Sequence, residues 1–94
     1  MAYLLVHQNV ADFTKWKQGF DEHQAMREAA GSKGGQVLQS ADDPNEVIVM
    51  MEWDTVEKAR AFAQSDDLRA AMERAGVTSP PRIHFLELAY SPSA

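Results

Sequence analysis

Cysteine is absent from this 94-residue sequence. A thiol nucleophile, a disulfide framework and a cysteine zinc site are therefore excluded. No apolar run is long enough to predict a helix that crosses a bilayer. The first seven residues have no basic start, and their apolar run is too short for a signal peptide, so we expect a cytoplasmic protein.

Positive charge is also scarce. Nine Lys and Arg residues stand against 14 Asp and Glu residues, which gives a net charge of −5 at pH 7. The basic residues form no run, so we expect neither a nucleic acid nor an anionic membrane as a partner. The sequence has no metal-binding spacing of the HxH or HExxH type, and no glycine-rich phosphate loop precedes a predicted helix. We therefore predict no metal site and no cofactor.

What is present is a regular alternation of strand and helix patterns. Asp12 is a plausible N-cap for an amphipathic helix, and the residues between 42 and 45 form a turn rich in Asp, Pro and Asn. The predicted elements are strands over 3–10, 36–40, 46–53 and 83–89, a helix over 12–30, and two shorter helices that start at Asp54 and Ser65. This β-α-β-β-α-β order predicts an α+β fold of ferredoxin-like topology, with a four-stranded antiparallel sheet and all helices on one face. We expect one domain over residues 1–94.

The strands carry apolar side chains on both faces of the predicted sheet. Alternation assigns to the helix-covered face Leu4, Val6, Val47, Val49, Met51, Leu86 and Leu88. The other face contains Tyr3, Leu5, Ile48, Met50, Ile83 and Phe85. This second face is too apolar to leave in water, and a second copy of the chain is the simplest cover. The sequence therefore predicts a homodimer whose interface includes His7, Asn9, Ile48, Met50, Glu52, Phe85 and Glu87.

Polar residues on the predicted dimer face have two interpretations. His7 and Glu52 are able to form an acid–base pair or a ligand pair. Alternatively, His7, Asn9, Glu52 and Glu87 are hydrogen-bonded groups within or at the rim of the interface, where such pairs fix the register. We favour the interface interpretation.

The whole chain resembles the dimeric α+β-barrel superfamily, close to the antibiotic-biosynthesis-monooxygenase-like and small cyclase-like proteins. The resemblance rests on the element order, the hairpin at 42–47, the strand end at 52–54, and Ala-rich helices with Phe62 and Ser65. It implies that two sheets pack face to face and that each subunit has a ligand pocket between its sheet and its helices. Haem-degrading members take a histidine from the second helical region, and residues 55–80 contain none, so haem is not expected.

A candidate pocket follows from placing the helix and strand residues against that architecture. Its members are His23, His84, Arg27, Trp16, Phe20, Met51 and Trp53. An aromatic slot with imidazoles and a guanidinium suits a flat phenolic or carboxylate ligand, because a histidine can take a phenolic proton and Arg27 can hold the oxyanion. The simpler alternative is that Trp16 and Phe20 are core residues, His84 bonds the backbone and the arginine reaches solvent.

Two functions remain open from the sequence. The first is a cofactor-independent monooxygenase-like or cyclase-like enzyme that acts on an aromatic or polyketide-like small molecule. The second is a dimeric ligand-binding or accessory protein without catalytic activity. Both use the same pocket, and a filled core without any pocket would leave a purely structural dimer.

Overall fold

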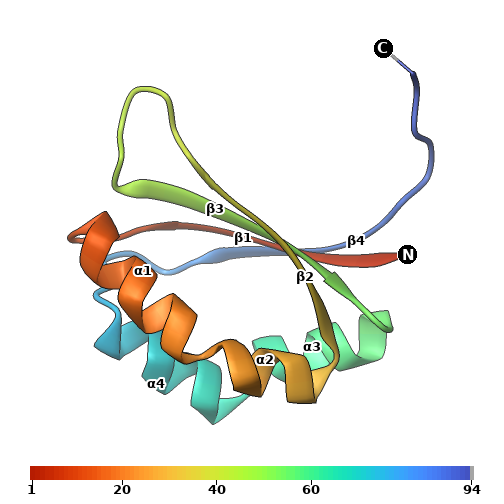
Figure 1. Cartoon of the computed structure of the whole chain (residues 1–94), viewed down its shortest axis with the longest axis horizontal. Coiled ribbons are helices and arrows are strands. Elements are labelled where there is room, and N and C mark those ends of the chain that lie inside the picture. Colours follow the sequence, from red (N-terminus) through yellow and green to blue (C-terminus); the bar gives the residue numbers. More distant parts are fainter. Residues whose placement is uncertain (94) are drawn as a thin grey trace.

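A four-stranded antiparallel sheet carries all the helices on one of its faces (Figure 1). The computed structural model describes residues 1–93. The elements are β1 (Ala2–Asn9), α1 (Phe13–Glu22), α2 (Gln24–Ala30), β2 (Ser32–Gln39), β3 (Glu46–Trp53), α3 (Val56–Ala63), α4 (Asp66–Arg74) and β4 (Arg82–Glu87). The strand order is β2-β3-β1-β4, and each pair of neighbours is antiparallel. The predicted ferredoxin-like α+β fold is therefore confirmed.

The first predicted helix is interrupted at His23. Asp12 caps α1 as expected, since its side chain accepts a hydrogen bond from the Lys15 backbone N–H at 3.3 Å. The His23 backbone N–H donates to two carbonyls, those of Gly19 and Phe20, at 3.2 Å each. His23 is thus the C-cap of α1 and the N-cap of α2, and its side chain makes no capping hydrogen bond.

The sheet between β1 and β3 follows the predicted alternation. Leu4 lies opposite Met51 and Val6 lies opposite Val49, and all four are buried. Directly opposite residues in an antiparallel pair project to the same face. Both strands therefore present their predicted apolar set to the helices, and these residues form the floor of the core.

Strand β4 has the opposite orientation from the predicted one. Phe85 lies opposite Leu4, which places it on the helix-covered face, where the Arg60 guanidinium lies 4.5 Å from the centre of its ring. His84 lies opposite Leu5 and is exposed on the uncovered face. The prediction was therefore wrong for His84 and Leu86, which lie on the uncovered face, and for Ile83, Phe85 and Glu87, which lie on the covered one. Leu88, predicted to share the face of His84, follows the end of the strand. The error has a physical reason: this strand is apolar at both parities, so alternation alone does not identify its buried face.

Two element boundaries also differ from expectation. Strand β2 begins at Ser32 rather than near residue 36, with a register shift between Ser32 and Gly34. The chain passes so close to β3 that a Cβ on Gly35 would overlap the Met50 carbonyl oxygen, so only glycine fits there. Thr55, not Asp54, caps α3, because the Thr55 side chain accepts the Lys58 backbone N–H at 3.1 Å.

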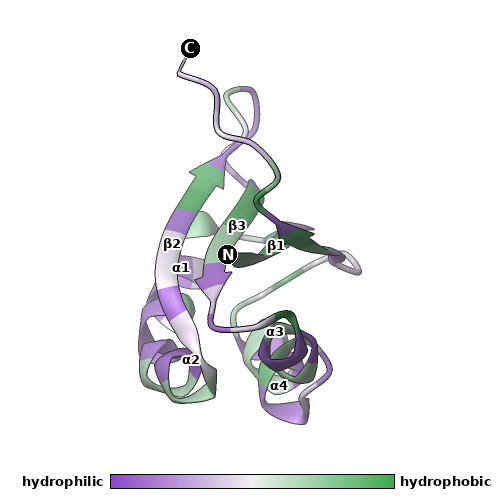
Figure 2. Ribbon diagram, turned by 90° about the vertical axis from the view of Figure 1, so that its right-hand side faces the viewer, coloured by the Kyte–Doolittle hydropathy of each residue, from purple (hydrophilic) through white to green (hydrophobic). Residues whose placement is uncertain are grey.

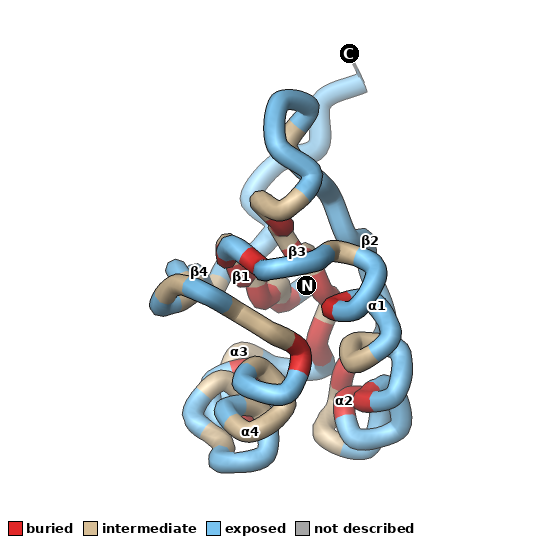
Figure 3. The backbone as a smooth tube through the Cα atoms, turned by 90° about the vertical axis from the view of Figure 1, so that its left-hand side faces the viewer, coloured by how far each residue is buried: buried red, intermediate tan, exposed pale blue. Residues whose placement is uncertain are grey.

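The helices form two separate pairs beneath the sheet, α1 with α2 and α3 with α4 (Figure 2). The pairs approach closely at Gly19 of α1, where an added Cβ would lie 3.2 Å from the Cβ of Ala75. Buried positions gather where the helices face the sheet and each other (Figure 3). This arrangement leaves a space between the sheet floor and the two helical pairs.

Candidate active site

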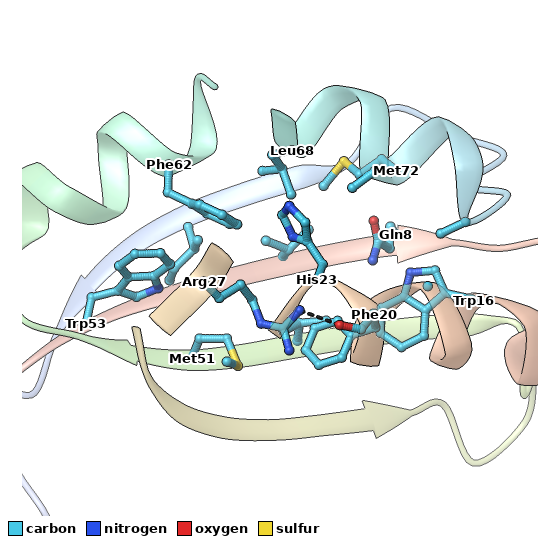
Figure 4. A pocket seen from close by; sticks show the side chains of 16 residues that line it. Gln8, Trp16, Phe20, His23, Arg27, Met51, Trp53, Phe62, Leu68 and Met72 are labelled. Carbon is cyan, nitrogen blue, oxygen red and sulfur yellow. Dashed lines mark hydrogen bonds between the residues drawn. The ribbon is translucent and has the colours of Figure 1, made fainter. Parts of the chain in front are cut away.

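A cavity of about 60 Å³ occupies the space between the sheet and the helical pairs (Figure 4). Strands β1 and β3 form its floor, and α1–α2 and α3–α4 form its two walls. The floor consists of Leu4, Val6, Gln8, Val49, Met51 and Trp53. The walls are Trp16, Gly19, Phe20, His23 and Arg27 on one side, and Phe62, Leu68, Ala71, Met72 and Ala75 on the other.

Six of the seven predicted pocket residues line this cavity. They are Trp16, Phe20, His23, Arg27, Met51 and Trp53. The seventh, His84, lies on the opposite face of the sheet and does not reach it. The structure therefore brings the six together, while their role in binding stays a prediction.

Aromatic rings surround the cavity on both sides. The Trp16 and Phe20 rings are stacked with their centres 5.0 Å apart, and the Trp53 and Phe62 rings lie 4.9 Å apart. Such walls favour a flat apolar ligand because rings pack with each other at these separations. Phe62 had no place in the predicted pocket, although the helical spacing of Val56, Ala59 and Phe62 already assigned it to an inner face.

Gln8 is the functional candidate that the sequence analysis missed. It is only 4% exposed and lies on the floor of the cavity. The available signal was a single polar residue on a face that otherwise carries Leu4 and Val6. A buried amide in that position needs hydrogen-bond partners.

Four buried polar atoms on the cavity lining have no hydrogen-bond partner within residues 1–93. They are Gln8 Oε1, His23 Nε2, Arg27 Nε and Trp53 Nε1. An unpaired buried polar atom costs roughly 1–3 kcal/mol, and native proteins have few of them. Their concentration around one cavity indicates a site that is completed by a ligand or by water.

The Arg27 side chain is buried as a charged group, with 7% of the residue exposed. Its Nη1 donates to the Phe20 carbonyl oxygen at 2.6 Å, and its guanidinium carbon lies 3.7 Å from the centre of the Phe20 ring. Burial lowers the pKa of Arg27, while the carboxylates of Asp21 and Glu28 act in the opposite direction. An arginine stays protonated in proteins, so the cavity holds a fixed positive charge.

His23 is 8% exposed and sits at the junction of α1 and α2. Burial lowers the pKa of its imidazole, the nearby charges of Arg27 and Arg74 lower it further, and only Asp67 raises it. The neutral form of the ring therefore predominates at pH 7, and a neutral imidazole nitrogen can accept a proton.

Two outer grooves adjoin the cavity. One has a volume of about 430 Å³, lies between α1–α2 and α4, and shares Gly19, His23 and Ala71 with the cavity. The other, of about 260 Å³ between α2 and β2, shares Arg27. The inner space is smaller than the roughly 150 Å³ that holds benzene in an engineered protein cavity. A larger ring therefore has to displace side chains at one of these two boundaries.

The predicted dimer-face residues divide between the two faces of the sheet. His7, Asn9, Ile48, Met50 and Glu52 lie on the uncovered face, whereas Phe85 and Glu87 lie on the covered one. The suggested pairing of His7 with Glu52 is wrong. Glu52 lies opposite Tyr3, and the partner of His7 is Glu46, with 2.8 Å between His7 Nε2 and Glu46 Oε1.

Asn9 is held at the end of β1 by the segment before β4. Its side-chain Nδ2 lies 3.4 Å from Ser79 Oγ, and its backbone carbonyl accepts the Thr78 N–H at 2.9 Å. This contact joins the end of β1 to the segment before β4, and the Asn9 side chain lies on the face of the sheet opposite the cavity.

Two further findings concern residues 1–93. No group of three or more His, Cys, Asp or Glu side chains is placed to hold a metal ion. None of the helices in this part of the chain has the length and apolar character needed to cross a membrane.

The fold and the site define the class of this chain, a small α+β protein of ferredoxin-like topology with a cavity between its sheet and its own helices. Within that class, the sequence matches the model of the antibiotic biosynthesis monooxygenase family over residues 11–74. The chain belongs to this family and is a small monooxygenase-like protein.

Solved structures share the fold over nearly the whole chain. A candidate antibiotic biosynthesis monooxygenase from Bordetella bronchiseptica is 18% identical, with a TM-score of 0.80 over 95% of this chain and 97% of its own. SnoaB from Streptomyces nogalater, a cofactor-independent oxygenase, is 11% identical, with a TM-score of 0.78 over 99% of this chain and 97% of its own. A candidate monooxygenase of the same description from Nitrosomonas europaea is 19% identical, with a TM-score of 0.72 over 96% of this chain and all of its own. At such identities the likeness shows the fold. No protein with a curated description matches the sequence.

Proposed function

We propose that this protein is a cofactor-independent oxygenase that converts a planar phenolic compound to a quinone with molecular oxygen. The observation that carries the proposal is the set of four unpaired polar atoms around one aromatic-walled cavity. The family supports it, as does the similarity in fold to SnoaB, which is a cofactor-independent oxygenase.

The two charged or titratable groups of the cavity have separate roles. His23 Nε2 is unpaired and neutral, so it takes the proton of the phenolic hydroxyl. The buried positive charge of Arg27 stabilises the phenolate that forms. Deprotonation matters because a phenolate gives up an electron to oxygen more readily than a phenol does.

The reaction then balances without a cofactor. The phenolate transfers one electron to O₂, and the two radicals combine to form a C–O bond at a ring carbon. Protonated His23 returns its proton to the outer peroxide oxygen. The O–O bond breaks, and the hydroxide leaves with the hydrogen of that ring carbon as water. For 1-naphthol, one substrate and one O₂ give one 1,4-naphthoquinone and one water.

A dimer completes the proposal. Exposed apolar side chains remain on the uncovered face, among them Leu38 at 47% and Leu86 at 38% exposure, next to the half-buried Leu5 and Met50. Burial of apolar area contributes roughly 25 cal/mol per Å², so a second copy packed on this face is stabilised. We expect sedimentation at micromolar concentration to show a dimer, and a stable monomer would contradict this part.

The oxygenase proposal is tested with an oxygen electrode and 1-naphthol. We expect consumption of one O₂ per quinone formed, with one atom of ¹⁸O₂ recovered in the quinone. The variant His23→Gln removes the proton acceptor and is expected to reduce kcat by about 10²- to 10⁴-fold. His84→Gln, on the other face of the sheet, is the matched control and should leave kcat unchanged.

Each contrary result has a distinct meaning. Binding of phenols in a thermal-shift assay without oxygen consumption would reject the oxygenase and leave a ligand-binding protein. Full activity in His23→Gln would reject the assigned base.

A further inference from the structure

Arg27 lies at the boundary between the inner cavity and the groove that separates α2 from β2. Among residues 1–93 it is the one residue that lines both spaces. A group bound to its guanidinium would therefore lie at the second mouth of the site, away from the mouth at His23.

The Arg27 guanidinium has N–H donors that make no hydrogen bond to the described residues. An arginine carries five N–H donors in a planar fork. Within residues 1–93, the only hydrogen bond of this side chain runs from Nη1 to the Phe20 carbonyl, and Nε is buried without a partner. The edge formed by Nε and Nη2, which matches the two oxygens of a carboxylate, therefore makes no hydrogen bond to the described residues.

The acidic residues near Arg27 are already engaged. The Asp21 carboxylate lies 2.8 Å from Lys17 Nζ, and the Glu28 carboxylate accepts a hydrogen bond from Gln24 Nε2 at 2.8 Å. No ion pair joins Arg27 to a carboxylate within the described part of the chain. A buried charge is best stabilised by a paired counter-ion, and the charges of Asp21 and Glu28 act on Arg27 without direct contact. An anion from outside the chain would supply the direct partner.

The groove beside Arg27 has room for such an anion. It is lined by Gln24, Arg27, Glu28, Ser32, Lys33 and Gly34. Gly34 has no side chain, and nothing lies within 4 Å of where its Cβ would be. Lys33 adds a second positive charge at the rim, with its Nζ 3.1 Å from Asp54.

We propose that the ligand is a hydroxyaromatic carboxylic acid, whose carboxylate binds the Nε–Nη2 edge of Arg27 while its ring occupies the cavity. The inference narrows the substrate class of the proposed oxygenase and rests on that function for the ring and its hydroxyl. The unused N–H groups of the same guanidinium leave the positive charge available to a phenolate oxygen on the neighbouring ring carbon.

The test compares three probes that share one ring system: 1-hydroxy-2-naphthoate, its uncharged amide, and 1-naphthol. Calorimetric titration of the wild-type protein is expected to show the acid binding about 10- to 100-fold more tightly than the amide. In Arg27→Gln, the affinity for the acid should fall to that for the amide, which itself changes little. Arg27→Lys should restore part of the preference, because it keeps the charge without the two-pronged edge.

Lys58→Gln is the matched control, since Lys58 is exposed and borders neither the cavity nor the groove. It should keep the full preference for the acid. A second measurement needs no variant at Arg27. The NMR signal of the wild-type Arg27 Nε–H should shift on addition of the acid and stay in place with the amide.

Equal affinities for acid and amide, a preference that survives in Arg27→Gln, or no binding of the acid at millimolar concentration would each overturn the inference. The readout is binding, so it is independent of turnover. Preference for the acid without oxygen consumption upholds the carboxylate site and contradicts only the oxygenase. Oxygen consumption with 1-naphthol, without a preference for the acid, upholds the oxygenase and contradicts the carboxylate site.

Discussion

The two faces of the sheet lack different things: the helix-covered face lacks hydrogen-bond partners for some polar atoms, and the uncovered face lacks a cover for its apolar side chains. The helix-covered face is shielded from water, yet polar atoms of Gln8 and Trp53 on it lack hydrogen-bond partners. On the uncovered face the polar side chain of His7 is paired with Glu46 at 2.8 Å, yet apolar side chains such as Leu38 remain exposed.

This difference separates two kinds of missing partner. Unpaired polar atoms in a small apolar space call for a ligand of matching size and polarity. An apolar sheet surface without buried unpaired polar side-chain atoms, as found here within residues 1–93, calls for a large apolar cover, which a second sheet of the same kind supplies. The covered face is therefore where chemistry is expected, and the uncovered face is where association is expected.

The largest effect should come from a charge placed on the uncovered face. Met50→Lys would bury an unpaired ammonium in the proposed interface, which costs several kcal/mol and should weaken the dimer by at least about 100-fold. Analytical ultracentrifugation over a concentration series measures this. Met26→Lys, on an exposed methionine of α2, is the control and should leave the dimer intact. An unchanged dimer in Met50→Lys would show that this face is not the interface.

The sequence predicted these faces well in the strands whose alternation is clear. In β3, every second residue from Val47 to Trp53 is buried, and the pattern identified that face without help. In β4, Ile83 and Phe85 compete with Leu86 and Leu88 as the apolar set, so only the pairing with β1 decides. Register is a property of two strands, and the sequence of one of them does not contain it.

The sequence also predicted part of the candidate site, namely most of the residues that were expected to line it. Trp16 and Phe20 followed from helical spacing, and Met51 and Trp53 followed from strand parity. The break at His23 was not predicted, because no proline or adjacent glycine marks it. The sequence also did not predict which polar atoms would lack hydrogen-bond partners, because this depends on how separate strands and helices pack around the cavity.

A smaller effect should follow from removing one unpaired atom on the covered face. Gln8→Leu replaces a buried amide by an apolar group of similar volume. We expect the free energy of unfolding to rise by about 1 kcal/mol, because the unpaired oxygen no longer opposes folding. Urea denaturation measures the change. Gln64→Leu, at the exposed residue that follows α3, is the control and should change stability by less than about 0.5 kcal/mol. Destabilisation by Gln8→Leu would mean that the amide is paired in solution and is not kept for a ligand.

The smallest effect concerns pH and the His23 imidazole. Burial and the charges of Arg27 and Arg74 lower the pKa of His23 in the folded protein. The unfolded chain therefore binds a proton more readily than the folded one, and stability increases with pH wherever the unfolded state holds more protons. The contribution of His23 to stability is complete above about pH 6.5, the ordinary value for histidine, and is lost as the pH falls from there toward the lowered folded value.

Chemical denaturation of wild type and His23→Gln between pH 5 and pH 8 isolates this contribution. The wild type should lose stability relative to the variant as the pH falls below about 6.5. Arg74→Gln removes one of the charges that lower the pKa and should flatten the wild-type curve. Parallel curves for wild type and His23→Gln would mean that the imidazole is solvated in solution. The cavity would then be open to water beside His23. The polar atoms of the covered face would be solvated, and the argument that this face needs a ligand would be contradicted.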